Sequence, residues 1–163
     1  MKNPVIITNK LFNHNALSQW LTRWRLINKT IAFTNGCFDI LHVGHLASLL
    51  KAAQEADLLV VGLNSDLSTK RLKGDTRPIN NQHDRALLLA ALVVVDAVII
   101  FEEDTPLELI KLVQPDVLIK GGDYTLEQIV GANEVLAAGG RVVINSIEEG
   151  HSTTGVLNKI AQL

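Results

Sequence analysis

Two histidines lie three residues apart, just after a short apolar segment. His42 and His45 follow residues 31–34, which predict a buried strand, and Gly44 stands between them. A helix that starts here would present free backbone N–H groups and the positive end of its dipole. Side chains three positions apart share a helix face, so both imidazoles could donate N–H bonds to one phosphate group. The spacing therefore predicts a site for a phosphorylated ligand.

Each part of this segment also has a simpler interpretation. A single histidine at a helix start is more often a cap or a surface residue, and Asn35-Gly36 alone is usually a turn. The histidine pair could instead bind a metal ion. No third ligand lies at an obvious spacing, however, and Asp39 could supply only one more. The combination is more specific than its parts, so we expect a phosphate site and no metal held by the protein.

A second group of hydrogen-bond donors precedes the last helix that the sequence predicts. The run Ser152-Thr153-Thr154 offers hydroxyls that could hold a triphosphate together with the free N–H groups of the helix terminus. Serine and threonine are common helix caps, so the run is a weak signal by itself. We expect it to face the same cleft as His42 and His45.

The elements that position these residues are indicated by alternating apolar segments. Strands are predicted at 31–34, 58–63, 97–101, 117–120 and 141–147, and helices at 15–27, 44–55, 81–92, 106–113, 126–138 and 152–161. Short, continuous apolar strands are typical of a sheet covered on both faces. Their alternation with helices predicts an α/β fold, a Rossmann-like doubly wound sheet of five parallel strands. Ligands bind at the carboxyl ends of such strands, where the polar and glycine-rich segments occur.

The N-terminal part of the chain is basic and contains both tryptophans. The first 38 residues carry five cationic side chains and no acidic one. Helical spacing places four apolar residues on one stripe: Leu17, Trp20, Leu21 and Trp24. The stripe favours a helix packed on the core, and a subunit interface is the alternative. The basic residues either form a solvated face or serve a phosphorylated ligand.

Composition narrows the class of protein. The chain has 163 residues, 47% of them hydrophobic and 20% charged, with a net charge of −2, as expected for one soluble globular domain. This charge argues against nucleic acid or an acidic membrane as a partner. The single cysteine, Cys37, excludes an internal disulfide and fits a reducing compartment. No signal-peptide pattern and no membrane-spanning apolar run is present, so we expect a cytoplasmic protein.

The paired-histidine segment resembles the nucleotidyltransferase superfamily that carries a His-x-Gly-His signature at the start of its first helix. A Ser-Thr-Thr run at the last helix is a second element of that superfamily. The resemblance implies that His42 and His45 steady the α-phosphate of a bound nucleotide as the transition state forms. It also implies a division into an N-terminal helical extension, 1–28, and a nucleotidyltransferase domain, 29–163.

A closer resemblance covers most of the chain. The segments that carry it are 34–45, 64–66, 71–74, 77–78, 101–106, 120–124 and 152–154. Together they resemble the D-glycero-D-manno-heptose 1-phosphate adenylyltransferases, which are often fused to a sugar kinase; this chain shows no kinase segment, which implies a stand-alone transferase. The resemblance implies transfer of AMP from ATP to heptose 1-phosphate, giving ADP-heptose for a surface glycan such as lipopolysaccharide. It further implies Mg²⁺ with the ATP, and a homodimer.

The resemblance assigns roles to individual residues. The catalytic residues are His42, His45 and Lys73; the nucleotide-binding residues are Thr34, Asn35, Gly36, Phe38, Gly44, Arg85, Gly121, Asp123, Tyr124, Ser152, Thr153 and Thr154; the substrate-binding residues are Asp39, Asn64, Asp66 and Arg77. Lys73 and Arg77 lie in a stretch, 68–77, that we expect to be mobile. Solvated surface charge is the alternative for these two residues and for Arg85.

Other functions remain open at this point. The same chemistry could act on glycerol 3-phosphate, ethanolamine phosphate or phosphopantetheine, with CTP or ATP as the donor. A catalytically silent nucleotide-binding module is a different class. The sequence does not favour a P-loop or dinucleotide enzyme, because neither Gly-x-x-x-x-Gly-Lys-Ser/Thr nor Gly-x-Gly-x-x-Gly occurs in it.

Overall fold

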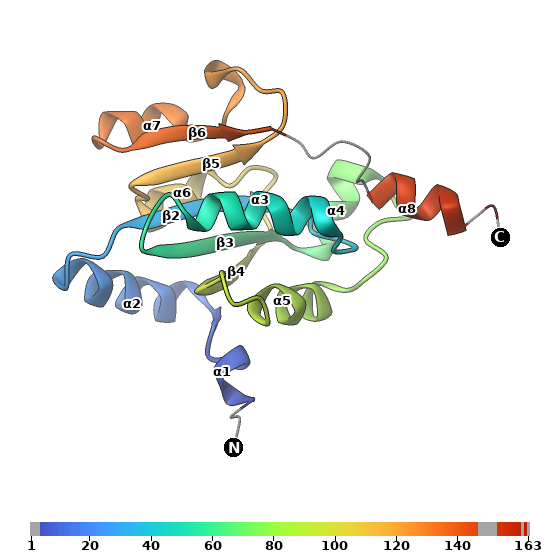
Figure 1. The fold of residues 1–163 in the computed structure, drawn as a ribbon, viewed down its shortest axis with the longest axis horizontal. Coiled ribbons are helices and arrows are strands. Elements are labelled where there is room, and N and C mark those ends of the chain that lie inside the picture. The colour runs from blue at the N-terminus through green and yellow to red at the C-terminus, as the bar shows by residue number, and fades with distance from the viewer. Residues whose placement is uncertain (1–3, 147–152, 161, 163) are drawn as a thin grey trace.

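A parallel sheet forms the centre of the computed structural model, which describes residues 4–146, 153–160 and 162 (Figure 1). Its strands are β1 (Leu11–Phe12), β2 (Ile31–Gly36), β3 (Leu58–Asn64), β4 (Ala97–Phe101), β5 (Val117–Gly121) and β6 (Arg141–Asn145), in the order β1-β4-β3-β2-β5-β6. The chain proceeds from β2 to β3 and β4 on one side, then crosses back to β5 and β6 on the other. The doubly wound α/β prediction is confirmed.

Among the described residues, the sheet contains one strand more than the five that the sequence predicted. The five predicted strands are present, and β1 adds a sixth by pairing Leu11 and Phe12 with Val98 and Ile99 of β4. A two-residue strand leaves no readable alternation in the sequence, because only its partner strand defines it.

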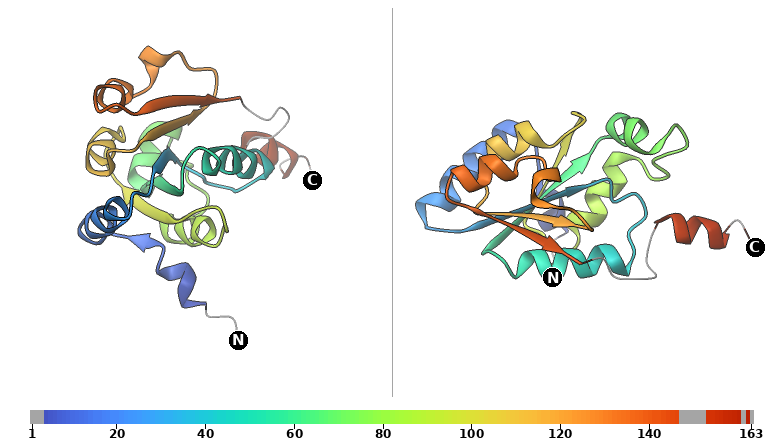
Figure 2. Two further views of the ribbon diagram at one scale, coloured as in Figure 1. Left: turned by 60° about the vertical axis from the view of Figure 1, so that its left-hand side comes forward. Right: turned by 90° about the horizontal axis from the view of Figure 1, so that it is seen from above.

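Helices cover both faces of the sheet. The helices of the described residues are α1 (Val5–Thr8), α2 (His14–Leu26), α3 (Val43–Ala53), α4 (Asp66–Lys73), α5 (Gln82–Ala90), α6 (Leu107–Val113), the 3₁₀ helix η1 (Leu126–Gln128), α7 (Ala132–Ala137) and α8 (Thr153–Ile160). Figure 2 shows α3 and α5 on one face, with α2, α6 and α7 on the other. In β3, Leu59, Val61 and Leu63 pack in the cluster under α3 and α5, while Val60 joins the opposite cluster. This alternation explains why a central strand is apolar throughout.

Two predicted segments differ from the structure. Residues 126–138 do not form one helix, because Gly131, with φ of 84°, separates η1 from α7. A Cβ at this position would lie 2.6 Å from Cδ1 of Ile110, so glycine also permits close packing there. No helix was predicted within residues 64–80, whereas residues 66–73 form α4, and the Ser65 hydroxyl accepts a hydrogen bond from the N–H of Ser68. The mobility expected for residues 68–77 stays a prediction. The polar sequence of α4 conceals it from apolar periodicity.

The tryptophan-bearing helix packs on the core, as one of the two interpretations predicted. Leu17 and Leu21 of α2 are buried in the cluster that also contains residues of the sheet, α6 and α7. Trp24 is half-buried and packs against the same cluster, whereas Trp20 is exposed. Phe12 of β1 contacts each of them edge-on with ring centroids 6.3 Å apart. The division at residue 28 stays a prediction, although α2 and β1 contribute to the same core and the same sheet.

We predict that Leu21→Ala lowers the free energy of unfolding by about 2–5 kcal/mol, because the substitution leaves a cavity in a close-packed core. Leu21 is 2% exposed, whereas Leu26 on the same helix is 78% exposed, so Leu26→Ala is the matched control and is expected to have little effect. Chemical denaturation of the two variants measures the difference. Equal stabilities would contradict the packing of α2 on the core.

Candidate functional site

A cavity of about 750 Å³ lies at the carboxyl ends of β2 and β5, where the strand order reverses. Most of the predicted site residues line it: Thr34, Asn35, Gly36, Phe38, Asp39, His42, Gly44, His45, Asn64, Lys73, Arg77, Gly121, Tyr124, Thr153 and Thr154. Arg85, Asp66 and Asp123 are not among its lining residues, and Ser152 lies outside the described part of the chain. The predicted meeting of both histidines with the hydroxyls of α8 in one cleft is confirmed for Thr153 and Thr154.

The two histidines form a stacked pair at the start of α3. His42 is the N-cap, and its Nδ1 accepts a hydrogen bond from the backbone N–H of His45 at 3.4 Å. The ring centroids are 3.8 Å apart with an interplanar angle of 23°. Because Nδ1 accepts this bond, the proton of a neutral His42 ring lies on Nε2. The ring of Phe38 contacts that of His45, with the ring centroids 5.3 Å apart.

His45 is neutral at ordinary pH. Burial, and next the charge of His42, lower the pKa of His45 from 6.5 to about 4, while the backbone carbonyl of Ile40 acts in the opposite direction. A neutral imidazole donates one N–H and carries no charge. His45 therefore suits stabilisation of a phosphate oxygen by a directed hydrogen bond.

Asp39 holds the loop that precedes α5. Its buried carboxylate accepts hydrogen bonds from the N–H groups of Ile79 at 2.7 Å and Asn80 at 3.0 Å. The second oxygen of Asp39 lies 2.8 Å from Nε of Arg77, so the two charges form an ion pair beside the cavity. Asp39 and Arg77 were predicted to bind substrate. In the structure, the charges of Asp39 and Arg77 are paired with each other.

Arg85 is fully buried and directed into the protein. Its guanidinium donates to the carbonyl oxygens of Asn80 at 2.9 Å, Cys37 at 2.5 Å and Asn64 at 2.9 Å, and to Asp66 Oδ1 at 2.7 Å. A phosphate contact by Arg85, as the sequence predicted, would require these bonds to be exchanged. The phosphate role came from the resemblance, and surface charge was its alternative; the burial of Arg85 contradicts the surface alternative.

Lys120, near the end of β5, is a charged residue that lines the cavity and to which the sequence analysis assigned no role. Its Nζ donates to Asn35 Oδ1 at 3.4 Å and lies 5.6 Å from the centre of the Tyr124 ring. Burial lowers the pKa of Lys120, the Lys73 ammonium lowers it further, and Cys37 acts in the opposite direction. A charged residue ending an apolar strand directly before Gly121-Gly122 was the available signal.

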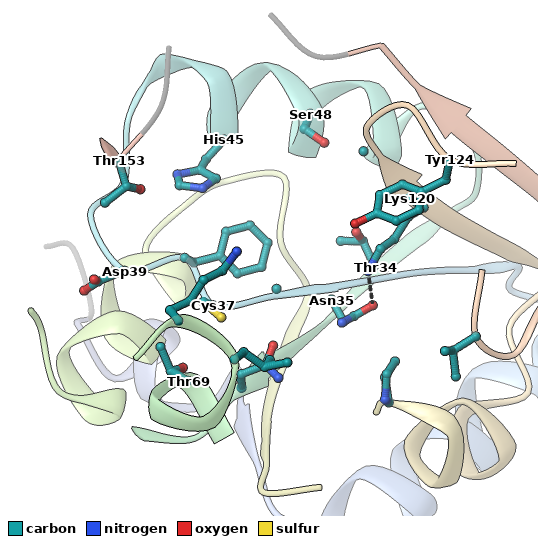
Figure 3. Close-up of a pocket in the computed structure, with 18 of the residues that line it drawn as sticks. Thr34, Asn35, Cys37, Asp39, His45, Ser48, Thr69, Lys120, Tyr124 and Thr153 are labelled. Atoms are coloured by element: carbon teal, nitrogen blue, oxygen red, sulfur yellow. Dashed lines mark hydrogen bonds between the residues drawn. The ribbon is translucent and has the colours of Figure 1, made fainter. Parts of the chain in front are cut away.

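The labelled side chains that line the cavity lie in two groups in Figure 3. His45, Thr153 and Asp39 lie toward one end in this view, and Lys120, Tyr124 and Asn35 toward the other. A dashed line marks the bond between Lys120 and Asn35. The site can therefore hold an elongated ligand, or two ligands that meet.

The described residues contain no group of three or more His, Cys, Asp and Glu side chains that could hold a metal ion. Carboxylates near the cavity are already paired, Asp39 with Arg77 and Asp104 with Arg71. In the same described part of the chain, no helix has the length and apolar character to cross a membrane.

Comparison with known proteins gives consistent matches. Residues 33–158 match the sequence model of a protein family described as cytidylyltransferase-like. The chain is 50% identical over 157 residues to the bifunctional protein HldE of Mesorhizobium japonicum, covering 96% of this chain and 32% of that protein. It is 57% identical over 143 residues to the bifunctional protein HldE of Nitrobacter winogradskyi, covering 88% and 29%. The chain thus spans about a third of the length of these curated relatives.

Two solved structures resemble the fold. The lipopolysaccharide core biosynthesis protein from Thermoplasma volcanium matches with a TM-score of 0.60 and 30% identity, covering 76% of this chain and 100% of that one. The pantoate-beta-alanine ligase from Francisella tularensis matches with a TM-score of 0.64 and 16% identity, covering 94% and 78%. The second likeness concerns the fold alone.

We predict that Arg85→Met lowers the free energy of unfolding by about 3 kcal/mol or more, because it leaves buried acceptors without their donor. Arg71→Met is the control, since Arg71 pairs with Asp104 at an exposed position and should contribute less than about 1 kcal/mol. Denaturant titration measures both variants. A stable Arg85→Met protein would show that the network is dispensable.

We predict that stability decreases as the pH falls from about 6.5 toward about 4, the two pKa values of His45 in the unfolded and folded chain. The sign follows because in this window the unfolded chain binds a proton at His45 that the folded chain excludes. His45→Gln should flatten this part of the wild-type stability curve. NMR titration of the His45 ring tests the cause directly, and a midpoint near 6.5 would refute it.

Proposed function

Because the chain belongs to the cytidylyltransferase-like family, we propose that it transfers AMP from ATP to a phosphorylated sugar and releases pyrophosphate. The acceptor we propose is D-glycero-D-manno-heptose 1-phosphate, and the product is ADP-heptose. Two observations support this substrate class. The curated relatives are bifunctional HldE proteins, and one similar structure is that of a lipopolysaccharide core biosynthesis protein. We further propose a cytoplasmic homodimer.

One observation carries the proposal. The stacked imidazoles of His42 and His45 line the same cavity as Thr153 and Thr154, although about 110 residues separate the two groups in the chain. The start of α3 supplies N–H groups and a positive dipole end for an α-phosphate. In this proposal, the hydroxyls of Thr153 and Thr154 bind the phosphates that leave as pyrophosphate.

The reaction is an in-line displacement at the α-phosphorus of ATP. A phosphate oxygen of the acceptor forms the new P–O bond, and the bond from the α-phosphorus to the bridging oxygen of pyrophosphate breaks. Pyrophosphate leaves with the electron pair of that bond. The acceptor phosphate is ionised near neutral pH, so no strong general base is needed. Catalysis then depends on positioning and on stabilisation of the charge that develops on the α-phosphate oxygens.

Neutral His45 fits this role because its N–H can strengthen a hydrogen bond as negative charge accumulates on the phosphate. The proton of His42 on Nε2 supplies a second donor. Mg²⁺ is proposed to accompany ATP and to neutralise charge on the triphosphate. The paired carboxylates around the cavity favour a metal held by phosphate oxygens and water rather than by protein ligands.

An acceptor panel tests the proposal. The purified chain is supplied with ATP or CTP and Mg²⁺, and with heptose 1-phosphate, glycerol 3-phosphate, ethanolamine phosphate or phosphopantetheine, while pyrophosphate release is measured. We expect ATP and heptose 1-phosphate to give the highest kcat/KM. Release with a different acceptor would change the substrate, and no release with any pair would refute a transferase function.

In the same assay, we predict that His42→Ala or His45→Ala lowers kcat about 100-fold, the usual effect of removing one donor that stabilises transition-state charge. His83 is exposed and outside the cavity, so His83→Ala is the matched control and should retain the wild-type rate. Circular dichroism confirms that each variant is folded. Near-wild-type rates in both cavity variants would contradict the assigned roles.

A further inference from the structure

A second cavity, of about 450 Å³, lies between α2, β1 and the residue that precedes β4. We call it the aromatic cavity, and it is lined by Asn9, Phe12, Trp20, Trp24 and Asp96. Of the residues that the structure describes, none lines both this cavity and the one that holds the histidine pair. Its volume falls within the range of roughly 300–1,000 Å³ that is typical of small-molecule sites. The proposed reaction gives this cavity no role.

Three aromatic side chains form the walls of the aromatic cavity. The ring of Phe12 is inclined by 74° to that of Trp20 and by 73° to that of Trp24, with the centroids 6.3 Å apart in both pairs. The two indole rings lie 5.9 Å apart and are inclined by 47°. None of these three pairs is stacked in parallel, so no ring lies flat against the face of another.

Faces of aromatic rings attract cations, because the ring quadrupole is negative above and below its plane, and indole is the strongest of these rings. The structure contains one such contact at this place. The guanidinium carbon of Arg23 lies over the Trp20 ring, 5.2 Å from its centroid. Arg23 is not a lining residue of the aromatic cavity. The walls of the cavity therefore favour a cation over an anion.

Asp96 adds a negative charge to the lining. This carboxylate is half-buried, and its Oδ2 accepts a hydrogen bond from the N–H of Leu59 at 2.8 Å. None of the ion pairs formed among the described residues includes Asp96. Burial raises the pKa of Asp96, and the opposing effects of the Leu59 N–H and the Lys10 charge do not offset it. A cation in the cavity would compensate for this desolvation.

The basic side chains nearby are directed elsewhere. Nζ of Lys10 donates to the carbonyl oxygen of Leu92 at 3.0 Å, and Arg25 donates to the carbonyl oxygen of Gln114 at 2.9 Å. Neither Lys10 nor Arg25 lines the aromatic cavity. The described lining thus consists of three rings, one carboxylate and one amide, which is complementary to a positive charge.

We propose that the aromatic cavity binds a small organic cation that carries a quaternary ammonium group. The methyl groups of the cation contact the rings of Phe12, Trp20 and Trp24, and Asp96 balances its charge. A primary ammonium needs three hydrogen-bond acceptors, whereas a quaternary ammonium needs none, and the described lining offers only the side chains of Asp96 and Asn9 as acceptors. This inference does not depend on the proposed transferase function.

Tryptophan fluorescence tests the inference directly. Both tryptophans of the chain line the aromatic cavity, so their emission reports on this site. The probes are choline and dimethylbutanol, the neutral isostere in which carbon replaces the charged nitrogen. We expect choline to give a saturable change and to bind at least about 10-fold more tightly than dimethylbutanol, because only choline has a charge. Equal affinities, or no saturable response to choline, would overturn the inference.

Two variants that keep both tryptophans separate the charge from the rings. Asp96→Asn keeps an oxygen that can accept from Leu59, and we expect it to weaken choline binding at least about 5-fold. Phe12→Leu keeps an apolar side chain without a ring face, and we expect a loss of at least about 3-fold. Neither should change the affinity for dimethylbutanol. Glu108→Gln is the control, since Glu108 is exposed on α6 and outside the cavity.

Wild-type choline affinity in both Asp96→Asn and Phe12→Leu would contradict the proposed site, provided that circular dichroism shows both variants to be folded. The comparison of choline with dimethylbutanol on the wild-type chain needs no variant and decides the matter if either one unfolds. A change of emission with protein concentration, in place of a response to choline, would identify a contact between copies of the chain and overturn the inference.

Arg23→Gln tests the attraction of Trp20 for cations in the opposite direction. The substitution removes a cation that contacts the Trp20 ring and repels a second one. We expect Arg23→Gln to bind choline at least about 2-fold more tightly than the wild-type chain. Weaker binding by this variant would show that the cavity does not recognise positive charge.

Discussion

The buried guanidinium of Arg85 joins the parts of the chain that form the floor of the cavity. It binds the loop after β2 through the carbonyl of Cys37, the end of β3 through that of Asn64, and the loop before α5 through that of Asn80. Its charge is balanced by Asp66 at the start of α4. Burying a charged group is costly unless it is paired and hydrogen-bonded. Separating any of these segments would leave the Arg85 guanidinium without a partner, so the network holds them together. The position of α4, and with it Lys73, depends on this arrangement.

Two kinds of polar side chain line the cavity at this edge of the sheet. At the start of α3, burial and the neighbouring charge of His42 lower the pKa of His45 to about 4, so its imidazole offers a hydrogen bond without a charge. Across the cavity, Lys120 and Lys73 offer charge without a balancing acid. A neutral imidazole such as that of His45 can strengthen a hydrogen bond to charge that develops during a reaction, whereas ammonium groups attract an anion that is charged from the start.

The sequence predicted the sheet well because its central strands are buried on both faces and are therefore continuously apolar. It failed where local pattern and tertiary context disagree. The helix α4 is polar along most of its length, and Gly131 interrupts a segment with helical composition because its backbone adopts a positive φ. The histidine pair was predictable because its spacing, its glycine and the preceding strand all act within twelve residues.

The sequence alone determined the α/β class, the strand–turn–helix unit around His42 and His45, and the chemistry that such a unit favours. The resemblance also predicted that Thr153 and Thr154 join them, whereas only the tertiary structure added Lys120 to the cavity. It also decided that Arg85 is directed inward. The reason is physical: local spacing sets which residues share a face of a helix or strand. Burial, charge balance and access to the cavity arise only from the elements that pack around that face.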